Sequence, residues 1–144
     1  MASSDRSWRE ARAAGLPILP LVADVARPTP AVGWRNAESV TLLERARQRF
    51  DCVMMLGILH HLLLADQIPM ADVAALLASL TRRWSIVEWV PKTDVRYIDL
   101  CRGRDELYAH LDEDLFIAHF TRHFTILTRE ELTNGRVLFL FEKK

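Results

Sequence analysis

The chain has 144 residues, half of them apolar, and its 19 basic residues are balanced by 19 acidic ones. That length suits one domain with a sizeable core, and the balanced charge disfavours a general binder of nucleic acid or anionic membranes. No uninterrupted apolar run approaches the roughly 20 residues of a membrane-spanning helix.

The two cysteines and the N-terminus indicate the compartment. Cys52 and Cys101 lie far apart and form no CxxC motif, which disfavours a disulfide scaffold or a Cys-rich zinc site and fits a reducing cytoplasm. The first residues, MASSDRSWREARAAG, mix acids with bases and have no apolar core segment, unlike a secretory signal. We therefore expect a cytoplasmic protein.

The first third of the chain combines a helix, a strand and a loop. Ser4–Ala14 is predicted to be a helix, with Gly15 just beyond its end. Pro17–Ala23 is a short apolar segment that predicts a strand, and Asp24 follows it. Residues 25–34, VARPTPAVGW, contain two prolines and a glycine, so they predict a loop.

The most apolar stretch follows a second predicted helix, Glu38–Arg49. Asp51–Leu59 runs apolar almost without interruption, which favours a strand buried on both faces, as in a parallel sheet covered by helices. His60 and His61 come directly after it. Ligand sites in such sheets lie at the carboxyl ends of the strands, so these imidazoles stand where chemistry is usually done.

The second half continues the alternation of helices and strands. Asn134-Gly135 is a tight-turn signal between the last two strands. The predicted elements are a helix at Pro69–Arg82, a strand at Ser85–Val90, a whole or broken helix at Asp94–Tyr108, a helix at Glu113–His123, and strands at Phe124–Leu127 and Arg136–Glu142. This order predicts an α/β layered fold with a mainly parallel sheet of about five strands and a terminal antiparallel strand.

Several of these stretches carry a family resemblance. ILPLVAD, FDCVMMLGILHHL, WSIVEWVP and the closing pair FTIL and RVLFLFEKK resemble the second half of a class I S-adenosylmethionine-dependent methyltransferase. More narrowly, PTPAVGWRNAES, LGILHHL, EWVPKTD and GRVLFLFEKK are similar to one bacterial subgroup. The resemblance covers the chain from about Leu16. It implies a Rossmann-like fold, S-adenosylmethionine as cofactor, and methyl transfer to a small molecule or another acceptor that the sequence does not identify.

The resemblance also implies cofactor-binding residues. In the family the acid after the third strand reaches the adenine, and Asp24 matches it, with Val25 beside it. The end of the fourth strand lines the methionine and substrate side, where Leu56 and Gly57 stand. The alternative for Asp24 is a loop residue that caps local amides, as is common for aspartate.

His60, His61 and Glu88 are the candidate catalytic residues. The resemblance implies that both histidines line the pocket, and imidazole can accept a proton near neutrality. Glu88 interrupts a buried strand, so it needs a partner or a raised pKa. The alternatives are that both histidines are satisfied structural groups and that Glu88 pairs with an arginine of a neighbouring helix. Adjacent histidines on a strand point to opposite faces, so we expect no metal site.

One departure from the family concerns its first half. Members begin with a strand, a glycine-rich GxGxG loop and a helix, and their second strand ends in an acid that holds the ribose. The five glycines of this chain are all isolated, and nothing replaces the backbone amides of that loop. The sequence therefore predicts one partial domain, residues 1–144, truncated at its N-terminus, that binds S-adenosylmethionine weakly or not at all by itself.

The truncation leaves a predicted open edge. In the family the strands are ordered 3-2-1-4-5-7-6, so strands 1 and 2 separate ILPLVAD from FDCVMML. Without them an apolar edge is unpaired, and such edges recruit other strands. ILPLVAD could pair there directly, a second copy or a complementing chain could do so, or the true reading frame could be longer. The alternative function is a non-catalytic remnant that acts as a protein-interaction module.

Overall fold

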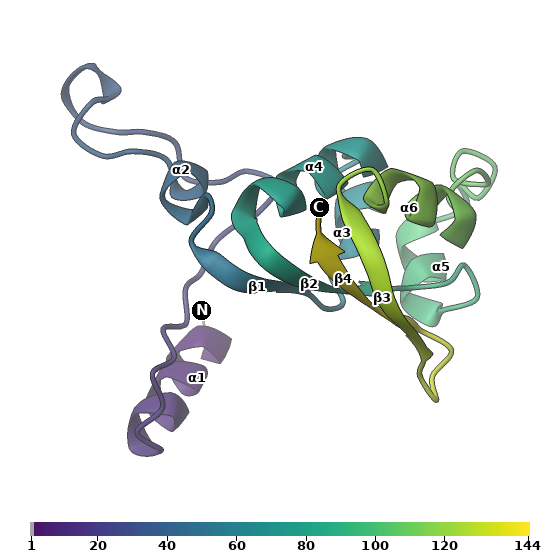
Figure 1. Ribbon diagram of the computed structural model, residues 1–144, viewed down its shortest axis with the longest axis horizontal. Coiled ribbons are helices and arrows are strands. Elements are labelled where there is room, and N and C mark those ends of the chain that lie inside the picture. Colours follow the sequence, from purple (N-terminus) through teal and green to yellow (C-terminus); the bar gives the residue numbers. More distant parts are fainter. Residues whose placement is uncertain (1) are drawn as a thin grey trace. The chain divides into compact units, whose positions relative to one another are not determined.

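The computed structural model describes residues 2–144 (Figure 1). The chain divides into two compact units, Met1–Leu42 and Leu43–Lys144, and each is considered by itself. Among the described residues, no helix combines the length and the apolar character that crossing a membrane requires.

The first unit contains one long helix and little other regular structure. Helix α1 (Ala2–Ala13) confirms the predicted helix, and a short 3-10 turn, η1 (Trp34–Asn36), follows further on. The predicted strand Pro17–Ala23 is wrong, because this segment forms neither strand nor helix. Its prolines lack the N–H groups that a strand ladder needs. Its apolar side chains are exposed, for example Leu19 at 73% and Val22 at 74%.

The next helix is much shorter than the predicted Glu38–Arg49. Helix α2 covers only Leu42–Ala46. Before it, the backbone of Ser39 pairs with that of Val32 in an isolated antiparallel bridge, which holds this part of the chain extended. After it, Gln48 has a positive φ of 52°, a conformation that interrupts a right-handed helix. Local pairing and backbone conformation therefore limit the helix at both ends.

The second unit is built on a mixed sheet of four strands. They are β1 (Phe50–Met55), β2 (Thr81–Trp89), β3 (Phe124–Glu131) and β4 (Val137–Lys143), in the order β1-β2-β4-β3. β1 and β2 are parallel, whereas β4 is antiparallel to both β2 and β3. The predicted mainly parallel, Rossmann-like sheet of about five strands is therefore wrong. The reason is that β4 turns back after β3 and inserts beside β2, and that the segment of residues 17–23 adds no strand.

The central apolar stretch is a strand for only part of its length. β1 ends at Met55, and Gly57 then adopts a positive φ of 65° that turns the chain. Helix α3 (Leu59–Leu64) begins two residues later, inside the predicted strand Asp51–Leu59. His60 and His61 therefore lie in the first turn of a helix, not directly at a strand end.

The remaining helices confirm the predicted ones with tighter bounds. They are α4 (Met70–Leu80), α5 (Val95–Cys101) and α6 (Glu113–Phe120). Two aspartates cap α5 and α6. The Asp94 carboxylate accepts a hydrogen bond of 2.8 Å from the Arg96 amide, and the Asp112 carboxylate accepts one of 2.8 Å from the Leu115 amide. Such side-chain caps satisfy amides that the first helical turn leaves unpaired, which explains why these helices begin where they do.

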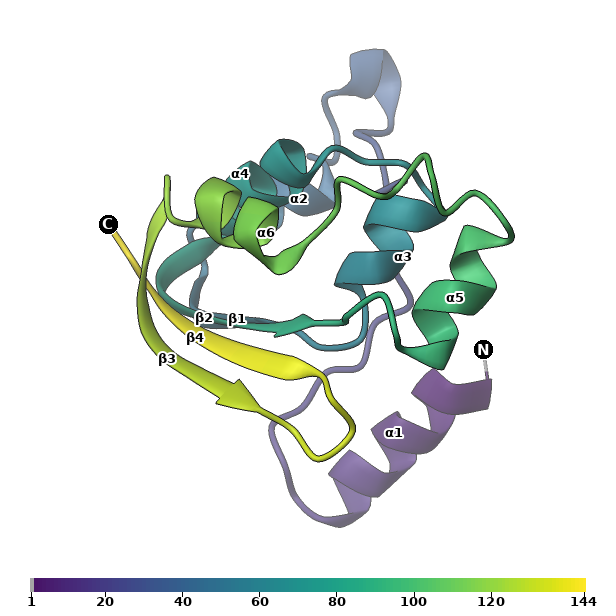
Figure 2. The same cartoon turned by 90° about the vertical axis from the view of Figure 1, so that its right-hand side faces the viewer.

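Helices α3, α4 and α6 cover one face of the sheet (Figure 2). Neighbouring positions on β1, β2 and β4 form rows across it, and the row on the covered side is Met55, Val87 and Phe139. These side chains are at most 9% exposed. Five phenylalanines, all fully buried, complete this core: Phe116, Phe120, Phe124, Phe139 and Phe141.

The adjacent row points to the opposite face. It consists of Met54, Ile86 and Leu140, which pair with one another across the same three strands. Each of them is the sequence neighbour of a residue in the first row. Met54 is 61% exposed, and Ile86 and Leu140 are partly exposed. No helix of the second unit, as far as the structure describes it, covers this row (Figure 2). The sheet is therefore apolar on both faces but covered by its own unit's helices on only one.

The aromatic core should dominate the stability of the second unit. Replacing Phe141, whose ring is stacked on Phe139 at 5.7 Å between ring centroids, by alanine leaves a cavity in a packed core. We expect Phe141→Ala to lower the free energy of unfolding by about 3–5 kcal/mol in urea denaturation. Leu127→Ala, at a 47% exposed position of β3, is the control and should cost less than about 1 kcal/mol. Equal losses for the two variants would contradict the assignment of the core.

Candidate functional site

Polar side chains gather where the parallel strands β1 and β2 end. Because the two strands run in the same direction, their carboxyl ends lie at the same edge of the sheet. Glu88 lies near the end of β2, Gly57 follows β1, and His60 starts α3. Asp94 caps α5, and Arg136 directly precedes β4. We call these five residues the strand-end cluster.

Arg136 holds the cluster together through two ion pairs. Its Nε donates a hydrogen bond of 2.8 Å to Oδ2 of Asp94, and its Nη1 lies 3.5 Å from both carboxylate oxygens of Glu88. The three side chains are only 11–19% exposed. The hydrogen bond from Arg136 lowers the pKa of Asp94, and the same bond raises the pKa of Arg136. The partner that Glu88 was predicted to need is therefore Arg136, which lies before a strand and not on a helix.

Gly57 faces Glu88 at the turn after β1. A Cβ placed on Gly57 would lie 3.6 Å from Oε2 of Glu88, an ordinary contact distance. Glycine is favoured here for another reason, because the φ of 65° is strained for residues with a side chain. The backbone at Gly57 therefore turns immediately beside a buried carboxylate.

His60 is buried without a hydrogen-bond partner. Its side chain is 3% exposed, and neither Nδ1 nor Nε2 has a partner among the described residues. Burial, followed by the charges of His61 and Arg136, lowers the pKa of His60 to about 4, against smaller opposite effects of Asp94 and Glu88. His60 is therefore uncharged at neutral pH. The predicted alternative of a fully satisfied structural histidine is wrong for His60.

The other predicted site residues lie outside the cluster. His61 is exposed, although its ring lies 4.4 Å from that of His60 between centroids, and Leu56 is 53% exposed. Asp24 and Val25 belong to the first unit. A pocket that Asp24 and Val25 share with His60 therefore stays a prediction.

Asp24 has local partners of its own. Its Oδ1 accepts hydrogen bonds from the backbone amides of Ala26 and Arg27 at 2.9 and 3.1 Å, and its Oδ2 lies 3.3 Å from Nη1 of Arg27. The hydrogen bond from the Arg27 amide lowers the pKa of Asp24. These contacts are those of the loop-capping aspartate, the alternative drawn from the sequence, and they leave the carboxylate on the surface.

Sequence reasoning did not identify Arg136 or Asp94 as members of the site. A signal for Arg136 was present, because the Asn134-Gly135 turn places it directly before the last strand. Once Val137 pairs with Trp89, the residue before it must lie near the end of β2. Among residues 2–144, no group of three or more His, Cys, Asp or Glu side chains is placed to hold a metal ion.

Comparison with known proteins gives one distant relative. The chain is 29% identical to the nodulation protein NoeA of Rhizobium meliloti (strain 1021) over 132 residues, which cover 87% of this chain and 26% of NoeA. The chain thus spans about a quarter of the length of that relative. No protein-family model matches the chain, and no solved structure matches it.

His60 should make stability depend on pH. Unfolding restores its ordinary pKa of 6.5, so between pH 6.5 and 4 the unfolded state binds a proton that the folded state does not. Stability is therefore lost as the pH falls through this window, by about 2 kcal/mol between pH 7.5 and 5. His60→Leu should remove that loss in urea denaturation at the two pH values. Leu62→Val, a buried change on the same helix that does not titrate, should keep the loss. An unchanged loss in His60→Leu would contradict the prediction.

Removing Arg136 should be costly, because two mostly buried carboxylates lose their counter-charge. We expect Arg136→Met to lower the free energy of unfolding at pH 7 by about 3 kcal/mol or more. The control is Arg129→Met, which breaks the more exposed pair with Glu113 at 2.6 Å and should cost clearly less than Arg136→Met. Urea denaturation of both variants measures the difference, and similar costs would show that Arg136 does not hold the cluster.

Proposed function

We propose that this chain provides the C-terminal part of a class I S-adenosylmethionine-dependent methyltransferase domain, and that methyl transfer needs a further segment or chain. The sheet order carries the proposal. The strand order that the resemblance implies ends in 4-5-7-6. In it, strand 7, the last in sequence, lies between strands 5 and 6. The order β1-β2-β4-β3 has the same pattern, with β4 between β2 and β3.

The strand-end cluster gives a second line of support. Gly57, His60 and Glu88 were predicted from the sequence as cofactor-binding or catalytic residues, and they come from two neighbouring parallel strands and the helix after the first. Their common edge is where open α/β sheets bind ligands. In the proposal this edge forms the wall that faces the methionine side of the cofactor and the methyl acceptor.

The pKa of His60 limits its role in this proposal. S-adenosylmethionine, when bound, supplies a methyl group that is already activated, so the protein mainly aligns the reactants and excludes water. A general base works best with a pKa near the working pH, and His60 has a pKa of about 4. We therefore give His60 a hydrogen-bonding role through its free ring nitrogens, and no role as a proton acceptor.

The described residues do not fit the whole cofactor. No glycine-rich turn is present, and the glycines at residues 15, 33, 57, 103 and 135 each stand alone. Asp24 already accepts hydrogen bonds from two local amides. The matched segment is 26% of NoeA, so in that relative it occurs together with much further chain. These points support a site that is completed by another segment, and we derive no reaction step for this chain alone.

An interaction module remains the second candidate function. The observation that favours it is the exposed row of Met54, Ile86 and Leu140, together with the unpaired edge of β1 within the described second unit. A second copy or a complementing chain could cover these groups, and in the first proposal the complementing chain would also supply the rest of the site. Neither candidate function identifies the methyl acceptor.

Titration with S-adenosylmethionine separates the two candidates. Losing two anchors of roughly 1.5–3 kcal/mol each weakens a micromolar site by on the order of a hundredfold or more. We expect a dissociation constant above about 100 µM, and amide shifts in ¹H–¹⁵N NMR spectra that are confined to residues 56–58 and 88–90. Gly57→Ala should abolish these shifts, whereas the control Gly103→Ala, also at a positive φ with open surroundings, should keep them.

Two outcomes would contradict this expectation in different ways. One micromolar site per chain would show that the described residues suffice for the cofactor. Saturable shifts confined to residues outside 56–58 and 88–90 would remove the support for methyl transfer at this edge and favour the interaction module. In that second case, sedimentation of the chain against Met54→Glu would test the module, because a charge on the exposed row should weaken association.

A further inference from the structure

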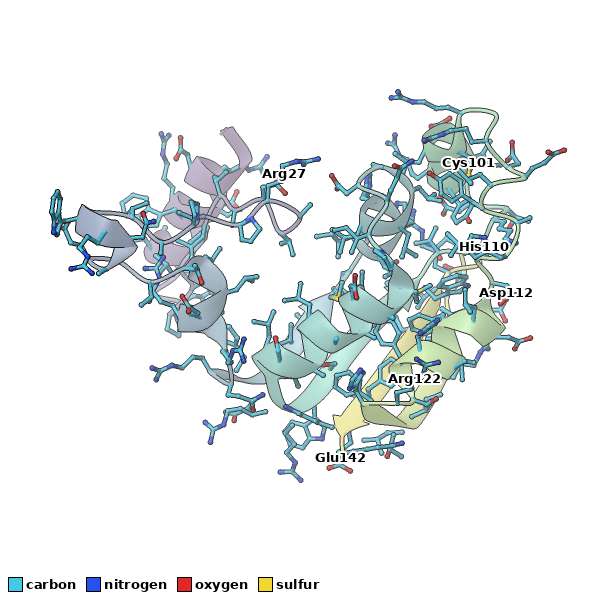
Figure 3. The ribbon with its side chains drawn as sticks, turned by 90° about the horizontal axis from the view of Figure 1, so that it is seen from above. Arg27, Cys101, His110, Asp112, Arg122 and Glu142 are labelled. Carbon is cyan, nitrogen blue, oxygen red and sulfur yellow. The ribbon has the colours of Figure 1, made fainter. Side chains whose placement is uncertain are left out.

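A pocket of about 630 Å³ lies in the second unit, apart from the strand-end cluster. Its walls are the α3–α4 connection at residues 67–71, the segment of residues 107–111 and one side of α6. Figure 3 labels His110 in the wall and Asp112 where α6 begins. No residue of the strand-end cluster lines the pocket, so binding in this pocket does not depend on methyl transfer.

The lining of the pocket offers no carboxylate, ammonium or guanidinium group to a charged ligand. None of the lining residues is Asp, Glu, Lys or Arg, and most are aliphatic, including Leu63, Met70 and Leu111 at 4–6% exposure. An ion moved into such surroundings loses its hydration without gaining a counter-charge. The volume is in the range of pockets that bury small molecules, roughly 300–1,000 Å³. The pocket therefore suits a neutral molecule with a large apolar part.

The ring-bearing residues favour an aromatic ligand. Tyr108, His110 and His119, which carry planar rings, are among the lining residues, and aromatic rings stack on such groups or meet them edge to face. Met70 adds a thioether, which also makes favourable contacts with rings. A flexible aliphatic chain would use none of these faces.

One polar atom in the wall lacks a partner. Nδ1 of His119 is buried and has no hydrogen-bond partner among the described residues. The nearby hydroxyl of Tyr108, in contrast, donates to the Leu64 carbonyl at 3.1 Å and accepts from Nε2 of Gln67 at 3.4 Å. An imidazole nitrogen can accept or donate a hydrogen bond. A ligand hydroxyl, which can do both, satisfies this nitrogen in either tautomer once the imidazole ring turns, because Nδ1 itself has no accessible surface toward the pocket.

From these observations we propose that the pocket binds a small neutral aromatic alcohol, with its rings between the aliphatic wall and Tyr108 and its hydroxyl on His119. The occupant has two or three fused or linked rings and carries no formal charge.

Three matched probes test this proposal on the full chain by NMR titration. We expect 2-naphthol to give saturable shifts at residues 67–71, 107–111, 115 and 119. Naphthalene, which lacks the hydroxyl, should bind about three- to tenfold more weakly, as expected for the loss of one hydrogen bond. Naphthalene-2-sulfonate, which adds a charge, should bind at least about tenfold more weakly than 2-naphthol.

Two variants locate the binding. Leu115→Trp fills the pocket and should abolish the shifts, whereas Leu127→Trp, the same change at an exposed position of β3, should leave them unchanged. His119→Phe keeps a ring and should reduce 2-naphthol to the affinity of naphthalene. The naphthalene affinity of His119→Phe shows that the variant still forms the pocket. No saturable shift with 2-naphthol, equal binding of the sulfonate, or unchanged binding in Leu115→Trp would overturn the proposal.

Discussion

The guanidinium of Arg136 joins the end of β2, the start of α5 and the start of β4. It does so by pairing with Glu88 and Asp94, both of which are mostly buried. A buried carboxylate without a counter-charge is strongly destabilising, whereas a complete pair is roughly neutral in its net contribution. The gain from this arrangement is therefore positional more than energetic. It fixes the last hairpin against the parallel strands and holds the Glu88 carboxylate beside the backbone turn at Gly57.

Local signals in the sequence predicted much of the second unit. The helices predicted to begin at Asp94 and Glu113 do begin there, capped by Asp94 and Asp112, because capping involves only residues two or three positions apart. The same logic failed for Pro17–Ala23. A continuous apolar run is compatible with a buried strand, but a strand also needs a partner, and pairing depends on residues far away in the chain. Gly57 shows the reverse case, since one backbone angle after β1 converts the predicted end of a strand into the start of a helix.

Three members of the strand-end cluster, Gly57, His60 and Glu88, were predicted from the sequence, but the ion pairs that connect the cluster were not. The position of Glu88 inside an apolar strand predicts that its carboxylate has a partner. That partner, Arg136, lies 48 residues away in the sequence, and only the register between β2 and β4 brings the two together. The state of His60 was equally beyond the sequence. A histidine near a strand end suggests proton transfer near neutrality, whereas its burial next to Arg136 gives it a pKa of about 4 and excludes that use. Burial is a property of the packed unit and not of the residue type.

The uncovered row of Met54, Ile86 and Leu140 has a consequence for the chain inside a cell. Apolar surface of this kind is what chaperones and proteases bind, and continuous triage by them sets how much of a protein accumulates. A chain whose row stays exposed is open to this triage, and a complement that covered the row would protect it. The steady-state amount of this polypeptide would then follow the supply of its complement, so that its abundance is set by stoichiometry more than by its own rate of synthesis.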